Sequence, residues 1–180
     1  MAPGQTAGIL TQVEVRVLEL EPSRTAVVRA TTSWPEFATQ WRPMLDEVWR
    51  FLRRGGAGVA KHGLNVMLYL DDAPTVEVGV QVDRDFEPSG SVVPSGLPGG
   101  LAATARHTGP MSRIGDTHDS VVRWCAEHGH ALTGVRWEIY GDPDPSTGHF
   151  DVEVFWALAS EVARGRDSSP FNVSRYVMLS

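Results

Sequence analysis

The chain of 180 residues contains very little cysteine and lysine, and it has no long apolar segment. Cys125 is the one cysteine, which excludes an internal disulfide and a metal site built from several thiolates. Nowhere do about 18 apolar residues follow one another, the length that a membrane-spanning helix needs. Residues 1–12 lack the basic and apolar segments of a signal peptide. We therefore expect a cytoplasmic protein outside the membrane.

The balance of charge also excludes a class of partner. The formal net charge is -6 and the isoelectric point is about 5.5, whereas a nucleic-acid-binding surface needs clustered positive charge. Lys61 is the one lysine, and we attribute this to a general preference for arginine rather than to phosphate binding. We expect no direct nucleic-acid binding. At 42% hydrophobic and 21% charged residues, the composition is that of a globular domain.

Motifs for nucleophilic catalysis and for cofactor binding are also missing. The chain has no Gly-x-Ser-x-Gly motif, and the glycines of residues 95–100 lack a phosphate-loop lysine. His118, His128 and His130 are close in sequence, but their spacing matches no standard set of metal ligands. We predict neither a cofactor nor a metal site.

The order of predicted elements occurs twice. Each copy has a strand, a helix and two further strands; the ranges are 25–32, 33–55, 65–72 and 75–82, and then 101–108, 115–129, 135–142 and 149–156. An earlier strand at 13–20 is expected to form a hairpin with 25–32. This gives one domain with repeat one at about 13–86, a Pro- and Gly-rich linker at 87–100, repeat two at 101–158 and a tail at 159–180.

The first helix has clear end signals and one conflicting residue. Ser33 and Glu36 have the spacing of a capping box, and Gly55 is typical of a helix end. Pro43 lies inside the same segment, where it would remove a backbone hydrogen bond. The start of the regular helix is therefore left open.

These elements predict an α+β fold. Two βαββ repeats would form one antiparallel sheet, with both helices on one face and a ligand cleft on the other. Alternation places Val135, Trp137 and Ile139 on one side of a strand, which we assign to the helices, and Glu138 on the other. The expected cleft-side residues are Glu138, Tyr140, Glu153, Phe155, Leu68 and Leu70. The alternative is that Glu138 is a solvated residue of an ordinary sheet.

The duplicated order, the run "HGHALTGVRWEIYGDP" at 128–143 and the run "DVEVFWAL" at 151–158 resemble the GyrI-like small-molecule-binding domain. The resemblance covers about residues 13–158. It implies a ligand cleft where the repeats meet, with Glu138 as a buried glutamate that faces aromatic, often cationic, ligands. Trp34, Phe37 and Trp41 would close one end of the cleft, although core packing explains Phe37 and Trp41 equally well.

The resemblance leaves the activity open. Regulators that carry this domain have a helix-turn-helix segment before it, so this chain resembles a stand-alone form. We expect it to bind bulky aromatic, lipophilic or cationic small molecules. A second hypothesis follows from stand-alone relatives that hydrolyse cyclopropane-containing electrophilic toxins, in which case Glu138 would be catalytic. A third is a protein inhibitor that acts through its acidic surface.

Overall fold

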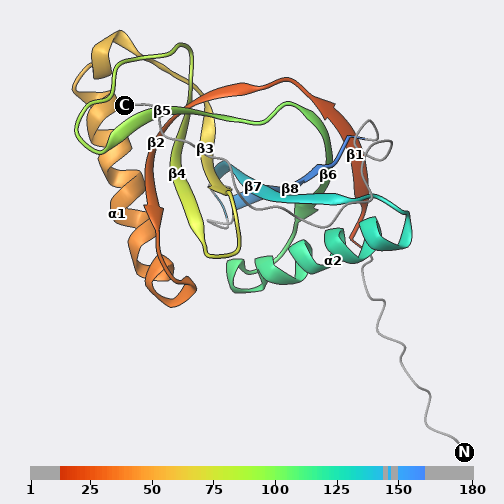
Figure 1. Cartoon of the computed structure of the whole chain (residues 1–180). Helices are drawn as coiled ribbons and strands as arrows, with labels where there is room; N and C mark the ends of the chain where they lie inside the picture. Colours follow the sequence, from red (N-terminus) through yellow and green to blue (C-terminus); the bar gives the residue numbers. More distant parts are fainter. Residues whose placement is uncertain (1–12, 144–145, 147–149, 161–180) are drawn as a thin grey trace, which may run out of the picture.

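The structure of the protein is a computed structural model that describes residues 13–143, 146 and 150–160 (Figure 1). Most of the expected tail, residues 161–180, lies outside this description. The elements are β1 (Val15–Leu20), β2 (Ser23–Thr31), α1 (Trp34–Arg53), β3 (Lys61–Tyr69), β4 (Thr75–Val82), β5 (Val92–Leu97), β6 (Gly100–His107), α2 (Ile114–Glu127), β7 (Leu132–Pro143) and β8 (Phe150–Leu158). Short 3-10 turns, Gly56–Gly58 and Met111–Arg113, lie before β3 and α2.

The two βαββ repeats join in one antiparallel sheet, as predicted. The strand order is β1-β6-β8-β7-β3-β4-β2-β5, so β3 of the first repeat pairs with β7 of the second at the centre. Met67 lies opposite Glu138 in this pair, and Tyr69 lies opposite Arg136. Because opposite residues in an antiparallel pair point to the same face, these four side chains share one side of the sheet.

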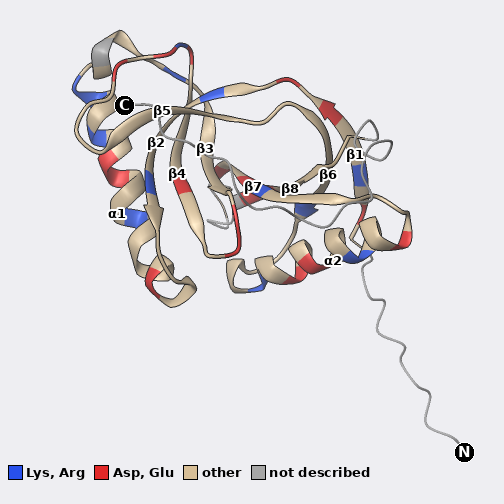
Figure 2. Cartoon of the chain, in the orientation of Figure 1, with Lys and Arg blue, Asp and Glu red and all other residues tan. Residues whose placement is uncertain are grey.

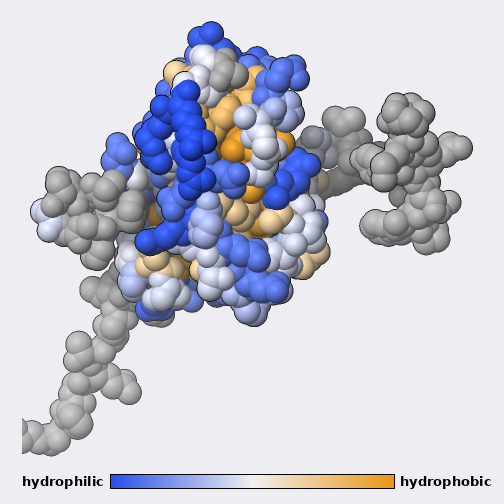
Figure 3. All heavy atoms as spheres, turned by 90° about the vertical axis from the view of Figure 1, so that its left-hand side faces the viewer, coloured by the Kyte–Doolittle hydropathy of each residue, from blue (hydrophilic) through white to orange (hydrophobic). Residues whose placement is uncertain are grey.

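Helix α1 packs on the first repeat. Its capping box forms as expected, since the Ser33 backbone N–H and hydroxyl both donate to Glu36 Oε2, at 3.2 and 2.7 Å. The helix continues through Pro43. Its buried residues, with Val48 the most enclosed, pack against valines of β2 and β4. The outer face of this side of the molecule is mainly hydrophilic, with apolar atoms visible between the polar ones (Figure 3).

Helix α2 packs on the second repeat, on the same side of the sheet. Val121 and Cys125 are fully buried against Ala103 and Ala105 of β6. The small alanine side chains leave room for the helix to lie close to the sheet. Acidic and basic residues are interspersed along both helices, as Figure 2 shows. Within the described ranges, neither helix is long and apolar enough to cross a membrane.

Two expectations about strand pairing are wrong. β1 does not pair with β2 in a hairpin; β1 pairs with β6, and β2 lies between β4 and β5. The segment expected to be a linker contains β5, which pairs with β2. Alternation identifies a strand but not its partner.

The sheet is strongly curved, with both helices on its outer side (Figure 1). Leu20 of β1 and Leu97 of β5 belong to opposite edge strands, yet both pack in one cluster with Trp137 from the centre. This contact is possible only if the face without helices is concave. The concave face therefore has its own apolar core, closed by the edges of the sheet.

Candidate functional site

Glu138 is a buried carboxylate at the centre of the sheet. It lies in the middle of β7, between Met67 of β3 and Val154 of β8, and only 3% of its surface is exposed. Burying a carboxylate is costly unless it receives hydrogen bonds or a cation. The groups around Glu138 therefore have to offset this cost.

The sequence analysis placed Glu138 on the wrong side of the sheet. His118 of α2 contacts Glu138 directly, so Glu138 faces the helices. Trp137, expected to pack under the helices, lies on the concave face, where its ring stacks on Phe155 at 5.2 Å. Alternation shows which residues share a side, but a curved sheet buries both of its faces, so an apolar row did not identify the helix side.

Three side chains donate hydrogen bonds to Glu138. His118 Nε2 is 2.8 Å from Oε1, and the Tyr69 hydroxyl is 3.1 Å from Oε2. The Tyr140 hydroxyl also donates to Oε2. Burial, followed by the negative charge of Glu138, raises the pKa of Tyr69 and Tyr140 well above the usual value. Both hydroxyls therefore keep their protons, and both can serve as donors.

Trp156 fixes the proton of His118. Its indole Nε1 lies 3.0 Å from His118 Nδ1, and an indole N–H can only donate. His118 Nδ1 must accept, which leaves the proton on Nε2, facing Glu138. An imidazolium would carry a proton on both nitrogens and would lose the bond from Trp156. These partners therefore assign the neutral Nε2–H tautomer, and none of the three donors to Glu138 carries a charge.

Aromatic rings surround this network on the α1 side. The Tyr69 ring centre lies 5.8 Å from that of Phe37 and 5.7 Å from that of Trp34. Phe37 is buried, whereas Trp34 is 47% exposed at the start of α1. The Trp34 ring thus connects the network to the solvent.

The guanidinium of Arg136 lies among the same rings. Its Cζ is 5.0 Å from the ring centre of Trp156, 5.5 Å from that of Tyr69 and 5.6 Å from that of Trp34. These are cation–π distances. Nη1 donates to Asp72 Oδ1 at 2.9 Å and to the Gly134 carbonyl at 3.3 Å. A cation thus already contacts the aromatic surface beside Glu138.

The structure brings only some of the predicted residues together. Tyr140, Trp34 and Phe37 lie on the side of Glu138, whereas Trp41 packs in the core beneath α1. Four residues lie on the concave face, so the expectation that they share a cleft with Glu138 is wrong: Leu68, Leu70, Phe155 and Glu153. Glu153 is instead bonded to Arg16 and Thr104.

Sequence reasoning missed four residues of the site: His118, Tyr69, Arg136 and Trp156. A signal existed for His118, which lies three and seven residues before the buried Val121 and Cys125 and therefore on the sheet-facing side of α2. The other three became visible only with the register between β3, β7 and β8.

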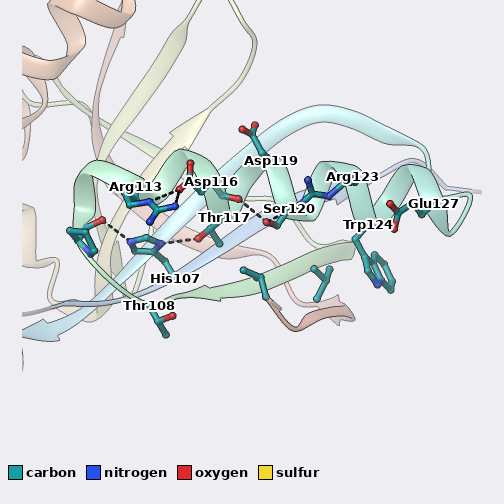
Figure 4. Close-up of a pocket in the computed structure, with 13 residues that line it drawn as sticks. His107, Thr108, Arg113, Asp116, Thr117, Asp119, Ser120, Arg123, Trp124 and Glu127 are labelled. Carbon is teal, nitrogen blue, oxygen red and sulfur yellow. Dashed lines mark hydrogen bonds and ion pairs between the residues drawn. The ribbon is translucent and has the colours of Figure 1, made fainter. Parts of the chain in front are cut away.

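A separate cavity of about 840 Å³ lies along another flank of α2. Figure 4 shows His107 at this cavity, bonded to Thr117 at 2.8 Å and to the Pro110 carbonyl at 3.2 Å. Glu138 is not among the lining residues of this cavity. Within the described residues, no group of three or more histidine, cysteine, aspartate or glutamate side chains is placed to hold a metal ion.

The fold resembles several solved structures at low sequence identity. The C-terminal domain of EcmrR matches with a TM-score of 0.69 and 16% identity, over 82% of this chain and 98% of that domain. SAV2435 bound to tetraphenylphosphonium matches with a TM-score of 0.57 and 11% identity, over 84% and 97%. A hydrolase from Listeria innocua matches with a TM-score of 0.50 and 12% identity, over 84% and 94%. At such identities the likeness concerns the fold alone.

Three further findings define the extent of the similarity. The chain covers 58% of EcmrR as seen in its complex with DNA, so that complex includes regions without a counterpart in the match. No curated protein matches the chain in sequence. The model of the GyrI-like small molecule binding domain matches residues 13–159, which is most of the chain. The chain therefore belongs to the GyrI-like small molecule binding domain family.

Proposed function

We propose that the protein binds bulky aromatic, lipophilic or cationic small molecules beside Glu138, between α1 and α2. The observation that carries this proposal is the buried carboxylate of Glu138, whose three hydrogen-bond donors are all uncharged. A cation brought next to this carboxylate would gain an ion pair in surroundings of low effective dielectric constant. The nearby rings would supply apolar and cation–π contact.

The half-exposed Trp34 supports entry from the α1 side. Its ring contacts Tyr69, which in turn donates to Glu138, so a ligand that stacks on Trp34 is one residue away from the carboxylate. The side chains that now fill this space would have to move as the ligand enters. The proposal therefore predicts changes in tryptophan fluorescence on binding.

Titration with tetraphenylphosphonium, the lipophilic cation bound by SAV2435, tests the proposal. We expect saturable binding to the native chain by calorimetry, and an affinity at least about tenfold weaker for Glu138→Gln, because the variant loses the charge that attracts the ligand. Glu77→Gln is the matched control, since Glu77 is an equally buried glutamate on the concave face. Equal loss in both variants, or no loss in Glu138→Gln, would contradict the proposed role.

A second candidate function is hydrolysis of strained electrophilic compounds at the same residue. The contact between His118 and Glu138 favours it, because a carboxylate linked to an imidazole is suited to orient and deprotonate water. Glu138 would then be the catalytic residue. Product formation from a cyclopropane-containing substrate, lost in both Glu138→Gln and His118→Gln, would support catalysis. Binding of such a substrate without turnover would contradict catalysis and support a role in binding alone.

A further inference from the structure

Arg136 already occupies the aromatic surface beside the Glu138 network. Its guanidinium lies within 5.0 to 5.6 Å of three ring centres, and two of these rings belong to residues of the Glu138 network. Arg136 and Glu138 are two residues apart on β7 and point to the same face of the sheet. The Arg136 side chain thus makes the same kind of cation–π contacts that we propose for a cationic ligand.

The contacts that hold Arg136 are of two kinds. The rings of Trp34, Tyr69 and Trp156 surround the buried guanidinium, while Nη1 bonds outward to Asp72 in the turn between β3 and β4. The Asp72 side chain is 90% exposed. Asp72 is therefore an exposed anchor that holds the guanidinium in place against the rings.

We propose that Arg136 is the resident cation of an aromatic cage formed by Trp34, Tyr69 and Trp156, and that a cationic ligand must displace it to bind. Two cations cannot share the same ring faces without repulsion at short range. Arg136 would therefore set the affinity and the charge preference of the site, with Asp72 as its outer anchor. This inference rests on the proposed function.

The first experiment compares tetraphenylphosphonium binding by calorimetry in the full chain and its variants. Arg136→Met retains an unbranched apolar side chain without the charge, and we expect it to bind at least about tenfold more tightly than the native chain because no cation has to leave the cage. Arg136→Lys keeps a positive charge but loses the planar guanidinium that stacks on the rings, so its affinity is expected to lie between those of the native chain and Arg136→Met. Arg113→Met removes an exposed arginine paired with Asp116 and controls for net charge, with no expected change.

A second experiment probes the cage without any lipophilic ligand. In Arg136→Ala the guanidinium is removed, and added ethylguanidinium should bind saturably and raise the melting temperature, whereas the native chain should not respond. Asp72→Asn is a further variant for the tetraphenylphosphonium titration. Because Asp72 is exposed, this variant leaves the interior of the protein intact. It should bind tetraphenylphosphonium a few fold more tightly, because it removes the outer anchor of Arg136.

The outcomes separate the two proposals. If native chain and Arg136→Met bind tetraphenylphosphonium equally, the displacement model is overturned while the proposed function stands. Binding by Arg136→Met alone supports the cage but removes lipophilic cations as ligands of the native chain. If no variant binds tetraphenylphosphonium, the proposed function fails, and the ethylguanidinium experiment tests the cage by itself. Binding of ethylguanidinium to Arg136→Ala but not to the native chain supports the cage. Absence of that binding overturns it. Should Arg136→Ala fail to fold, Asp72→Asn and Arg136→Met decide by the tetraphenylphosphonium titration.

Discussion

Two buried glutamates, Glu77 and Glu138, lie on opposite faces of one sheet and have opposite kinds of partners. Glu77, 1% exposed on the concave face, accepts hydrogen bonds from the guanidinium of Arg29 and from Ser95 Oγ at 2.7 Å. Glu138 accepts its hydrogen bonds from an uncharged imidazole and two tyrosine hydroxyls. The first carboxylate is a completed ion pair that contributes to structure. The second has hydrogen bonds without a contacting cation, which is why we place ligand binding there.

The largest difference between the two sites should appear at alkaline pH. The raised pKa values of Tyr69 and Tyr140 mean that the folded state holds both phenolic protons above pH 10, where the unfolded chain releases them. Their contribution to stability is full below about pH 10 and is lost as pH rises further. With two groups at about 1.4 kcal/mol per pH unit each, the free energy of unfolding should fall by roughly 2 to 3 kcal/mol between pH 10 and pH 11.

Urea unfolding at several pH values measures this fall. The double variant Tyr69→Phe/Tyr140→Phe should lose the part that belongs to the Glu138 site and show a shallower decline. Arg29→Met changes the partner of Glu77 and should leave the slope above pH 10 unaltered, because Tyr69 and Tyr140 keep their places beside Glu138. An unchanged slope in the double variant would show that the tyrosines near Glu138 do not retain their protons as inferred.

The second effect concerns the ion pair of Glu77. Arg29→Met removes the charged partner and leaves Glu77 buried with Ser95 as a donor. Loss of one partner of a fully buried pair costs about 3 to 5 kcal/mol, and the half-exposed position of Arg29 reduces our expectation to about 2 kcal/mol of unfolding free energy. Chemical denaturation measures it. Arg24→Met, in an exposed pair with Asp85, should change stability by at most about 0.5 kcal/mol, and equal effects would refute the distinction.

The fold was predictable wherever local pattern determined it. The capping box at Ser33 and Glu36 and the helix-periodic apolar residues located α1, and the repeated order of elements predicted that the two halves would share one sheet. The partners of β1 and the existence of β5 were not predictable, because alternation contains no information on which edge a strand joins.

Sequence reasoning indicated Glu138 and three residues on its side of the sheet, Tyr140, Trp34 and Phe37. Glu138 stood out as an acid among apolar and aromatic residues, and the resemblance supported it. The predicted side of the sheet for Glu138 was wrong. The edge strands cover the concave face and bury it, and the sequence of β7 contains no sign of this. Trp156 and Arg136 required the register of three strands, and the tautomer of His118 required the position of one indole nitrogen.

The smallest effect concerns the link that keeps the donors of Glu138 uncharged. Trp156→Phe retains an aromatic ring but removes the N–H that His118 Nδ1 accepts. Loss of one hydrogen bond should lower the free energy of unfolding by about 1 kcal/mol. The more specific result is in the two-bond ¹H–¹⁵N spectrum, where His118 should change from a single Nε2–H form to a mixture that includes protonated Nδ1. Trp124→Phe is the control, because Trp124 stacks on His128 and His130 instead. A single Nε2–H form in Trp156→Phe would mean that Glu138 alone selects the tautomer. The uncharged state of the donors to Glu138, which distinguishes this site from that of Glu77, would then not depend on Trp156.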